Sequence, residues 1–466
     1  MPAVLIDVSV EQGGGARART QVKLGSTIYV FGDDAGTDDF SYWKSTDSGA
    51  TWGAAVSIFN NGAGGQWFDI YYEKWKVADR PNVVHLAYSQ DFGTRGVYYA
   101  QLDLDTDVIS GEIVALGLGS HPNVGCGSIG VARSGRIRID GLATLSAPNG
   151  VYSTDGGATW IDAGNTPCEA TADRIVWWAD FSSADQDDLI ALFFDNSATE
   201  ISLKLDDFSA GTLTEPTSVD VITSTNIGSN WGSALDRTTG HIYLAALELL
   251  GAGSNSLHTY DIYGSTSTPK TDAVSAVTHL QNATIAIDAD GIRVFYGRDA
   301  AAASVSSLEI YTKLSTDTMA TWGVEALYSS RDSDIVQLYA DPQPVGGMAP
   351  AWFEDSGNDL YIDAVIATII SLVVSGTVVP NATEQEVRDG GQTIILTLTG
   401  ATWEATMGDC NEITERLIDQ LVSGENELLG WNNIVRGGVS YEDAVLTDVP
   451  LASWRLADTA ATSGNG

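Results

Sequence analysis

Basic side chains are scarce in this chain of 466 residues, because Lys and Arg total 23 against 61 Asp and Glu, for a formal net charge of −38. A surface this negative repels phosphate backbones and anionic lipid head groups, so neither nucleic acid nor a membrane is expected as a direct partner. A particle component, adaptation to high salt and cation binding all remain compatible with this charge. Hydrophobic residues make up 44% of the chain, enough for a packed core, so the acidity does not predict disorder.

Cysteine and long apolar runs are also scarce. The three cysteines form no Cys-x-x-Cys pair, so neither a zinc site nor a disulfide scaffold is predicted. The most apolar stretch, residues 361–380, contains Asp363 and many β-branched residues, which favours buried strands over a membrane helix. The N-terminus lacks a charged region followed by an apolar run, so no secretory signal is expected.

What the chain does contain is an eight-residue pattern that occurs three times, at 45–52, 153–160 and 315–322. The copies start 108 and 162 residues apart, both multiples of 54. Each copy reads as a tight hairpin turn in which the Asp accepts backbone N–H bonds, a Gly takes a positive φ and the Trp packs beneath. In the third copy Met319 replaces the Gly, which predicts strain or a changed turn. The shared positions are Ser45, Asp47, Gly49, Thr51, Trp52, Ser153, Asp155, Gly157, Thr159, Trp160, Ser315, Asp317, Thr321 and Trp322.

Strand-like segments recur with the same period, starting near residues 17, 67, 125, 174, 231, 283 and 335. Units of about four short strands predict an all-β fold, a seven-bladed or alternatively six-bladed β-propeller over residues 1–374. We expect the strand at 4–10 to complete the last blade and close the ring.

The octet Ser-x-Asp-x-Gly-x-Thr-Trp resembles the Asp-box, or BNR repeat, of sialidase-type propellers. That resemblance implies a propeller fold, with the boxes on blade hairpins away from the catalytic face. It therefore implies structural turns, so Asp47 and Asp155 are not expected to be catalytic.

Beyond residue 374 the pattern changes to a strand at 391–399, a helix expected at 410–423, a Gly-Trp-Asn segment at 430–432 and a polar tail at 457–466. Residues 375–456 are expected to form a small β-rich, Ig-like module with one helix. This order of elements is similar to a module recurrent in virion proteins of tailed phages and prophages. The alternative is an accessory module of a secreted enzyme.

Catalytic signatures are mostly missing. A sialidase-like site needs three Arg to clamp a carboxylate, a Tyr nucleophile with a Glu partner, and an Asp acid/base. The family's first Arg lies in an Arg-Ile-Pro context, whereas this chain has only Arg17-Ala-Arg19-Thr20 there. Arg237, Arg293 and Arg298 could supply later clamp positions, and the histidines share no metal-binding spacing.

Aromatic and acidic clusters leave ligand contacts open. Aromatic side chains on a propeller rim can stack on sugars, although most are expected to pack between blades. Ca²⁺ could bind the acidic clusters at 33–39, 103–107 and 185–188, but none matches an EF-hand loop, and no metal or other cofactor is predicted. The ligand-contact candidates are Trp75, Trp177, Trp231, Arg237 and Arg293.

These observations favour a non-enzymatic structural protein of a tailed virus particle, a tail fibre or spike or a head decoration. It would be made in the host cytoplasm and located in the virion. Its partners would be other virion proteins and a host-surface glycan or receptor. The alternatives are a sialidase-like glycoside hydrolase and a cellular secreted adhesin.

Overall fold

The computed structural model describes residues of the propeller in segments. These are 4–7, 10–11, 19–34, 39–60, 68–72, 82–90, 96–117, 124–143, 149–165, 172–195, 200–209, 212–214, 219–222, 227–248, 255–277, 280–298, 308–333, 335–344, 351–355 and 360–362. Contacts divide the chain into units Met1–Ile366 and Ala367–Gly466. The expected module at 375–456, its helix at 410–423 and the tail at 457–466 lie outside the described residues.

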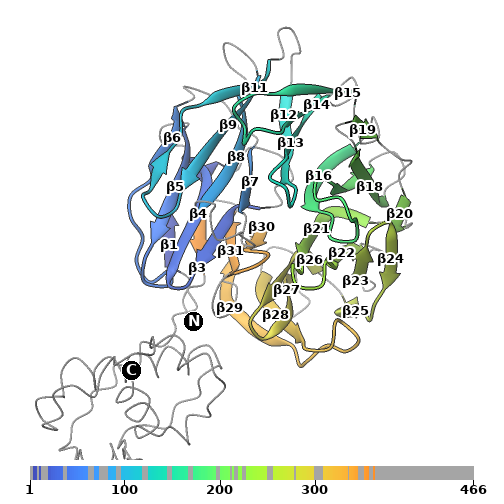
Figure 1. The fold of residues 1–466 in the computed structure, drawn as a ribbon. Coiled ribbons are helices and arrows are strands. Elements are labelled where there is room, and N and C mark those ends of the chain that lie inside the picture. Colours follow the sequence, from blue (N-terminus) through green and yellow to red (C-terminus); the bar gives the residue numbers. More distant parts are fainter. Residues whose placement is uncertain are drawn as a thin grey trace, which may run out of the picture. The chain divides into compact units, whose positions relative to one another are not determined.

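All described regular elements are strands, and they form seven antiparallel sheets, numbered here in chain order (Figure 1). The all-β propeller fold is therefore confirmed. Sheet 1 contains β2 (Val10–Glu11), β3 (Gln21–Leu24), β4 (Thr27–Asp34), β5 (Asp39–Ser45) and β6 (Val56–Asn60). Sheet 2 contains β7 (Phe68–Tyr72), β8 (Val83–Gln90), β9 (Gly96–Asp103), β10 (Val108–Ile109) and β11 (Ile113–Gly117). Sheet 3 contains β12 (Val124–Val131), β13 (Ile137–Ala143), β14 (Asn149–Ser153) and β15 (Ile161–Asn165).

The remaining four sheets follow the same plan. Sheets 4 to 7 contain β16 (Ala172–Ala179), β17 (Leu189–Asp195), β18 (Glu200–Ser209), β19 (Thr212–Thr214) and β20 (Val219–Ile222); β21 (Ile227–Leu235), β22 (Ile242–Glu248), β23 (Asn255–Tyr263), β24 (Thr266–Pro269) and β25 (Val274–Val277); β26 (Leu280–Asp288), β27 (Gly291–Arg298), β28 (Leu308–Ser315) and β29 (Ala326–Ser333); and β30 (Ile335–Ala340), β31 (Ala351–Asp355), β32 (Leu360–Ile362) and β1 (Val4–Asp7).

The ring is closed by strand pairing and by packing. β1 pairs antiparallel with β32, with Val4 opposite Ile362, so the start of the chain completes sheet 7 as its outermost strand. Tyr339 of sheet 7 packs with Val30 and Trp43 of sheet 1. A strand from one end of the chain thus joins the sheet formed at the other, which fixes the two ends of the propeller to each other.

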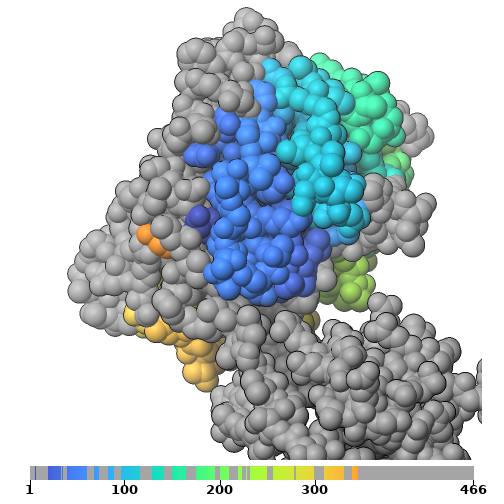
Figure 2. Space-filling model, turned by 90° about the vertical axis from the view of Figure 1, so that its left-hand side faces the viewer, coloured from blue at the N-terminus to red at the C-terminus, as the bar shows by residue number. Residues whose placement is uncertain are grey.

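The hydrophobic core lies between neighbouring sheets. Phe31 and Phe40 of sheet 1 pack with Phe68 and Tyr88 of sheet 2, and Figure 2 shows these two sheets, blue and light blue to cyan, side by side. First strands of successive sheets also contact one another: β7 with β12, β12 with β16, β16 with β21, β21 with β26 and β26 with β30. These first strands therefore line the centre of the ring.

The three octets adopt one turn, and each joins the third strand of a sheet to its fourth. In the second copy the Ser153 hydroxyl donates to Asp155 Oδ1 (2.8 Å) and accepts from the Gly157 N–H (2.8 Å). Thr159 donates to Asp155 through its N–H (2.9 Å) and its hydroxyl (2.5 Å). The copies at Ser45 and Ser315 repeat these bonds, so the expected hairpin geometry is present in all three.

Met319 keeps the turn type at a local cost. Its φ is 63°, against 89° and 94° for Gly49 and Gly157 at the same position, so the turn is unchanged and the predicted strain falls on Met319. The Met319 side chain is fully buried in the hydrophobic cluster that also contains Tyr243 and Val294. Burial of a Met side chain is worth about 1.5–3 kcal/mol, which offsets a left-handed backbone cost of about 1–2 kcal/mol.

Candidate binding site

A buried ion pair lies at the centre of the ring. Arg19 precedes β3, and its Nη2 is 2.6 Å from Asp69 Oδ2 on β7. Arg19 also donates to the main-chain carbonyls of Ile129 on β12 and Trp177 on β16, and to the Ser128 hydroxyl. One guanidinium from sheet 1 therefore connects the first strands of sheets 2, 3 and 4.

Asp69 is held as firmly as Arg19. Its Oδ2 accepts the Ile129 N–H (2.9 Å) and the Ser128 hydroxyl (2.5 Å) in addition to Arg19. The Arg19 guanidinium also lies over the rings of Tyr71 (4.8 Å) and Trp178 (5.1 Å), a cation–π arrangement. Both charges are compensated by partners in the protein, which assigns the pair a structural role.

Beside this pair the ring centre has a shallow hollow that is open to solvent, with about 310 Å³ of space when the solvent at its mouth is included. Its position is set by the ends of first strands: Tyr72 ends β7, Asp341 follows β30, and Arg237 lies in the turn after β21. It therefore opens at the end that carries the octet turns, since those turns follow third strands. The lining residues are Arg19, Gln21, Val22, Ile70, Tyr71, Tyr72, Trp178, Arg237, Asp341, Pro342 and Gln343.

The polar groups of the hollow differ in how they are satisfied. Asp341 accepts the main-chain N–H groups of Lys23 (2.7 Å) and Gln343 (2.8 Å), and Arg237 Nη2 donates to the Tyr72 carbonyl (2.9 Å). The Gln21 side chain is 2% exposed, yet neither its amide nitrogen nor its oxygen has a hydrogen-bond partner, and Gln343 Oε1 is also buried without one. Such groups cost free energy unless a ligand or water satisfies them.

No strong nucleophile is present among the described residues of the hollow. Burial raises the pKa of Tyr72 to about 12, against the opposing effect of Arg237, so its phenol stays protonated at neutral pH. Its hydroxyl donates to Asn82 Oδ1 (3.0 Å). The hollow can therefore donate and accept hydrogen bonds, but it lacks an activated base–nucleophile pair of the kind that covalent catalysis needs.

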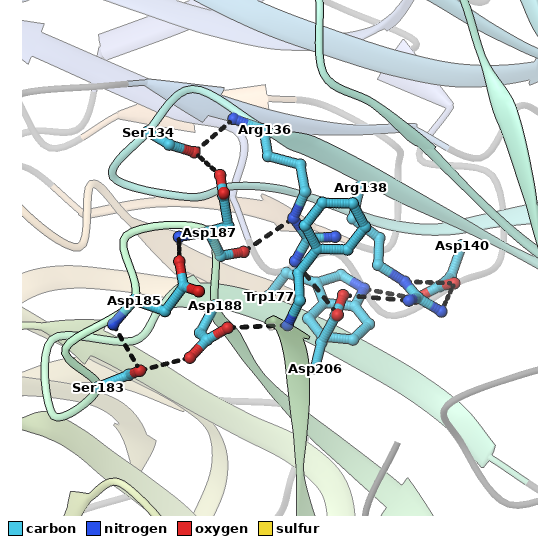
Figure 3. Close-up of polar contacts among 11 residues, drawn as sticks. Ser134, Arg136, Arg138, Asp140, Trp177, Ser183, Asp185, Asp187, Asp188 and Asp206 are labelled. Atoms are coloured by element: carbon cyan, nitrogen blue, oxygen red, sulfur yellow. Dashed lines mark hydrogen bonds and ion pairs between the residues drawn. The ribbon is translucent and has the colours of Figure 1, made fainter. Parts of the chain in front are cut away.

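A second buried cluster, the inter-sheet network, joins sheets 3 and 4 (Figure 3). Arg138 Nη1 lies 3.0 Å from Asp206 Oδ2, Arg138 Nη2 lies 3.3 Å from Asp140 Oδ1, and Arg136 Nη2 lies 3.2 Å from Asp206 Oδ1. Asp140 Oδ2 also accepts the Trp177 indole N–H (2.6 Å). Burial raises the pKa of Asp140 to about 6, while Arg138 acts in the opposite direction. Two cations and two anions compensate one another here, as in a structural clamp.

The loops beside this network continue the connection between the two sheets (Figure 3). Arg136 Nε donates to the Asp187 carbonyl (2.8 Å), and the Ser134 hydroxyl donates to the Asp187 carboxylate. Arg133 Nη2 donates to the carbonyls of Ser183 (2.6 Å) and Asp185 (2.7 Å). The acidic cluster at 185–188 therefore serves the contact between the sheets, and among the described residues no group of His, Cys, Asp and Glu is placed to hold a metal ion.

The residues predicted to contact a ligand do not lie together in one site. Trp177 is fully buried with its indole N–H bound to Asp140, which gives it a packing role in this structure. Trp231 is 5% exposed within the same core, and Arg293 is ion-paired with Asp288 (2.7 Å) and Asp290 (3.2 Å). Arg237 alone of these reaches the hollow, and Trp75 lies outside the described residues.

Sequence reasoning missed Gln21, Tyr71, Trp178 and Asp341 as parts of one site. Tyr71 and the neighbouring tryptophans were visible as aromatic residues in strand patterns, but Gln21 has no motif around it. Only the position of each residue near the end of a first strand brings them together.

The arginines that could form a sialidase-like clamp do not converge. Arg19 is committed to Asp69, Arg293 to Asp288 and Asp290, and Arg298 Nη1 lies 2.5 Å from Glu325. Tyr296 donates to Glu325 (2.5 Å), and Tyr88 donates to Glu112 (2.7 Å) in sheet 2. In both of these sheets a second-strand Tyr donates to a Glu just before an outer strand, so this Tyr–Glu pair occurs twice as a structural feature.

No family model matches the sequence, and no curated protein matches it. Among solved structures it is similar to an ulvan lyase of polysaccharide lyase family PL25, with 11% identity, a TM-score of 0.50 and coverage of 77% of this chain and 95% of that one. It is likewise similar to the BP39L lectin of Burkholderia pseudomallei, with 11% identity, a TM-score of 0.51 and coverage of 77% and 96%. At this identity the similarity establishes the propeller fold alone. Among the described residues, no helix is long and apolar enough to cross a membrane.

Proposed function

We propose that the propeller binds a carbohydrate in the hollow at its centre and does not cleave it. The observation that carries this proposal is the unpartnered, buried amide of Gln21, which lines a hollow shared with Arg237, Asp341 and the side chains of Tyr71 and Trp178. Ligand pockets combine a few hydrogen-bonding side chains with a mostly apolar lining in this way. The named activities of the two similar structures, a lectin and a polysaccharide lyase, agree with this ligand class.

Binding without cleavage is supported by the chemistry of the hollow. Asp341 is the only carboxylate among the described lining residues, and it is held by two main-chain N–H groups. Glycoside hydrolysis usually requires two carboxyl groups that flank the scissile bond, or, in sialidases, a Tyr nucleophile in place of one of them. The sialidase-like alternative would place its site at the end of the ring opposite the octet turns, where the turns between second and third strands lie outside the described residues.

A glycan array probed with the full chain tests this function. We expect binding to a limited set of saccharides and no release of product from fluorogenic sialosides or neutral glycosides. Arg237→Met should abolish binding, whereas Arg298→Met, which removes a half-buried arginine away from the hollow, should leave it unchanged. Turnover that Arg237→Met, Arg293→Met or Arg298→Met removes would show an enzyme instead.

We propose further that the three octets are Asp-box turns of the sialidase type. The support is the same set of hydrogen bonds in all three copies and their common place between third and fourth strands. Their Asp side chains are occupied by Ser and Thr of the same octet, which suits a structural turn.

The C-terminal resemblance supports a setting for this propeller. We propose that the chain is a component of a tailed virus particle, a tail fibre, spike or head decoration that presents the propeller to a host-surface glycan, with a secreted adhesin as the alternative. Quantitative mass spectrometry of purified particles is the test. A fixed copy number per particle is expected, and detection only in the secreted fraction of uninfected cells would favour the adhesin.

A further inference from the structure

The hollow at the ring centre has a charge balance that does not favour an anion. Arg19 is neutralised by Asp69, and the Arg237 cation shares the hollow with the Asp341 carboxylate. The chain as a whole carries a formal charge of −38, which repels acidic ligands at long range. An acidic saccharide therefore gains no net attraction from this site.

The unpartnered atoms indicate which hydrogen-bonding groups a ligand must bring. Gln21 Nε2 is a donor, whereas Gln21 Oε1 and Gln343 Oε1 are acceptors, and all three are buried without a partner. A carboxylate or sulfate offers only acceptors, so it would leave both amide oxygens unsatisfied. A hydroxyl group donates and accepts, so adjacent hydroxyls on one sugar ring can satisfy all three atoms.

The size of the hollow limits the ligand. The hollow is shallow and open to solvent, so only one edge of a ligand can enter it. The Arg19 guanidinium already lies over the rings of Tyr71 and Trp178, so hydrogen bonding to hydroxyls contributes more here than stacking on those rings. Both facts fit a single sugar unit that presents one hydroxyl-bearing edge to the hollow, such as the end of a chain.

We propose that the hollow selects one neutral, polyhydroxylated sugar unit over its acidic counterpart, and that Gln21 is the specificity-determining residue. This inference rests on the carbohydrate-binding function proposed above. The Gln21 amide donates to one hydroxyl and accepts from an adjacent one. The half-buried Gln343 offers a second acceptor at the edge of the hollow.

The test uses matched ligands that differ only in one carboxylate. Saturation-transfer NMR and calorimetry with the full chain would compare methyl β-glucoside with methyl β-glucuronide, and methyl β-galactoside with methyl β-galacturonide. The neutral member of at least one pair should bind tenfold or more tightly than its acidic partner, in 0.15 M and in 0.5 M NaCl. The high-salt arm screens the charge of the chain, so a preference that persists there comes from hydrogen bonding.

Variants assign the preference to Gln21. Gln21→Met keeps the size of the side chain and Gln21→Glu removes its donor, and each should weaken neutral-sugar binding tenfold or more while the thermal transition stays cooperative. Gln343→Met should weaken it less, and Arg298→Met should not change it. Equal or tighter binding of the acidic sugars, or unchanged binding by both Gln21 variants, would overturn this inference but leave carbohydrate binding intact. Failure of all four glycosides and of the glycan array would overturn the proposed function as well.

Discussion

Two buried polar regions of the propeller differ in how their side chains are satisfied. In the inter-sheet network, each of Arg136, Arg138, Asp140 and Asp206 belongs to an ion pair within the protein. In the hollow at the ring centre, the Gln21 amide is as well buried but has no partner. A buried polar group that is satisfied internally contributes to the specific packing of the fold, whereas one left unsatisfied costs stability. The difference is one of charge compensation: Arg136 Nη1 also lacks a hydrogen-bond partner, but its guanidinium is ion-paired with Asp206, whereas the Gln21 amide has neither kind of partner.

The largest expected effect on stability comes from disrupting the ion pairs of the inter-sheet network. Gly150 lies opposite Asp140 in the β13–β14 pair, and a Cβ at this position would be 2.2 Å from Asp140 Oδ1 and 2.7 Å from Arg138 Nη2. We expect Gly150→Ala to lower the free energy of unfolding by about 3–5 kcal/mol, because breaking a buried ion pair has costs of that size. Denaturant unfolding measures it.

Gly111→Ala is the matched control for this prediction. Its added Cβ meets no heavy atom within 4 Å, so its stability should stay within about 0.5 kcal/mol of the parent protein. Equal stability of the two alanine variants would show that the inter-sheet network does not hold sheets 3 and 4 together.

A change in stability of the opposite sign is expected in the hollow, where the Gln21 amide has no hydrogen-bond partner. Gln21→Met replaces a buried amide that has no partner by an apolar group of similar size, so we expect the free energy of unfolding to rise by about 1 kcal/mol. The same variant should lose sugar binding, a trade of function for stability. A clear loss of stability in Gln21→Met would mean that the amide is satisfied within the protein and would remove the contrast.

The third octet tests whether side-chain burial offsets backbone strain at Met319, and the expected change in stability is about as large as for Gln21→Met. Met319→Gly relieves a left-handed backbone but loses a fully buried side chain, so a net loss of about 1 kcal/mol is expected in thermal or denaturant unfolding. Thr318 is the control, since it also has a positive φ of 55° but is exposed. Thr318→Gly should raise stability by several tenths of a kcal/mol. If both variants behave alike, burial of Met319 is not what offsets its strain.

The smallest expected effect on stability comes from exposed carboxylates that accept hydrogen bonds within the octet turns. Hydrogen bonds from Thr159 and Ser153 lower the pKa of Asp155 to about 2, and the equivalent bonds lower that of Asp317 to about 2. A lowered pKa contributes stability above the ordinary value near 4, and this contribution disappears as the pH falls toward 2. Melting temperatures between pH 5 and pH 2 should therefore fall less steeply in Asp155→Ala than in the parent. The surface variant Asp220→Ala should follow the parent curve.

Much of the architecture could be predicted because the signals are local and repeated. The predicted unit starts near residues 67, 125, 174, 231, 283 and 335 lie within four residues of the first strands β7, β12, β16, β21, β26 and β30. The octet turns were also predictable, since Ser, Asp and Thr of one octet bond to each other within four residues. The contact of Trp177 with Asp140 could not be predicted, because a Trp in a strand pattern gives no indication of whether it faces solvent or, as here, an Asp on the neighbouring sheet.

The sequence by itself determined the all-β propeller, the repeated turns and the scarcity of available cations, because each depends on residues close together in the chain or on composition. Only the tertiary structure decided which polar residues meet. Arg19 and Trp177 are 158 positions apart, and Gln21 and Gln343 are separated by most of the propeller, yet each pair lies at the ring centre. Ring closure by β1 and β32 brings the two ends of the propeller together, and no local pattern encodes which side chains then share one hollow.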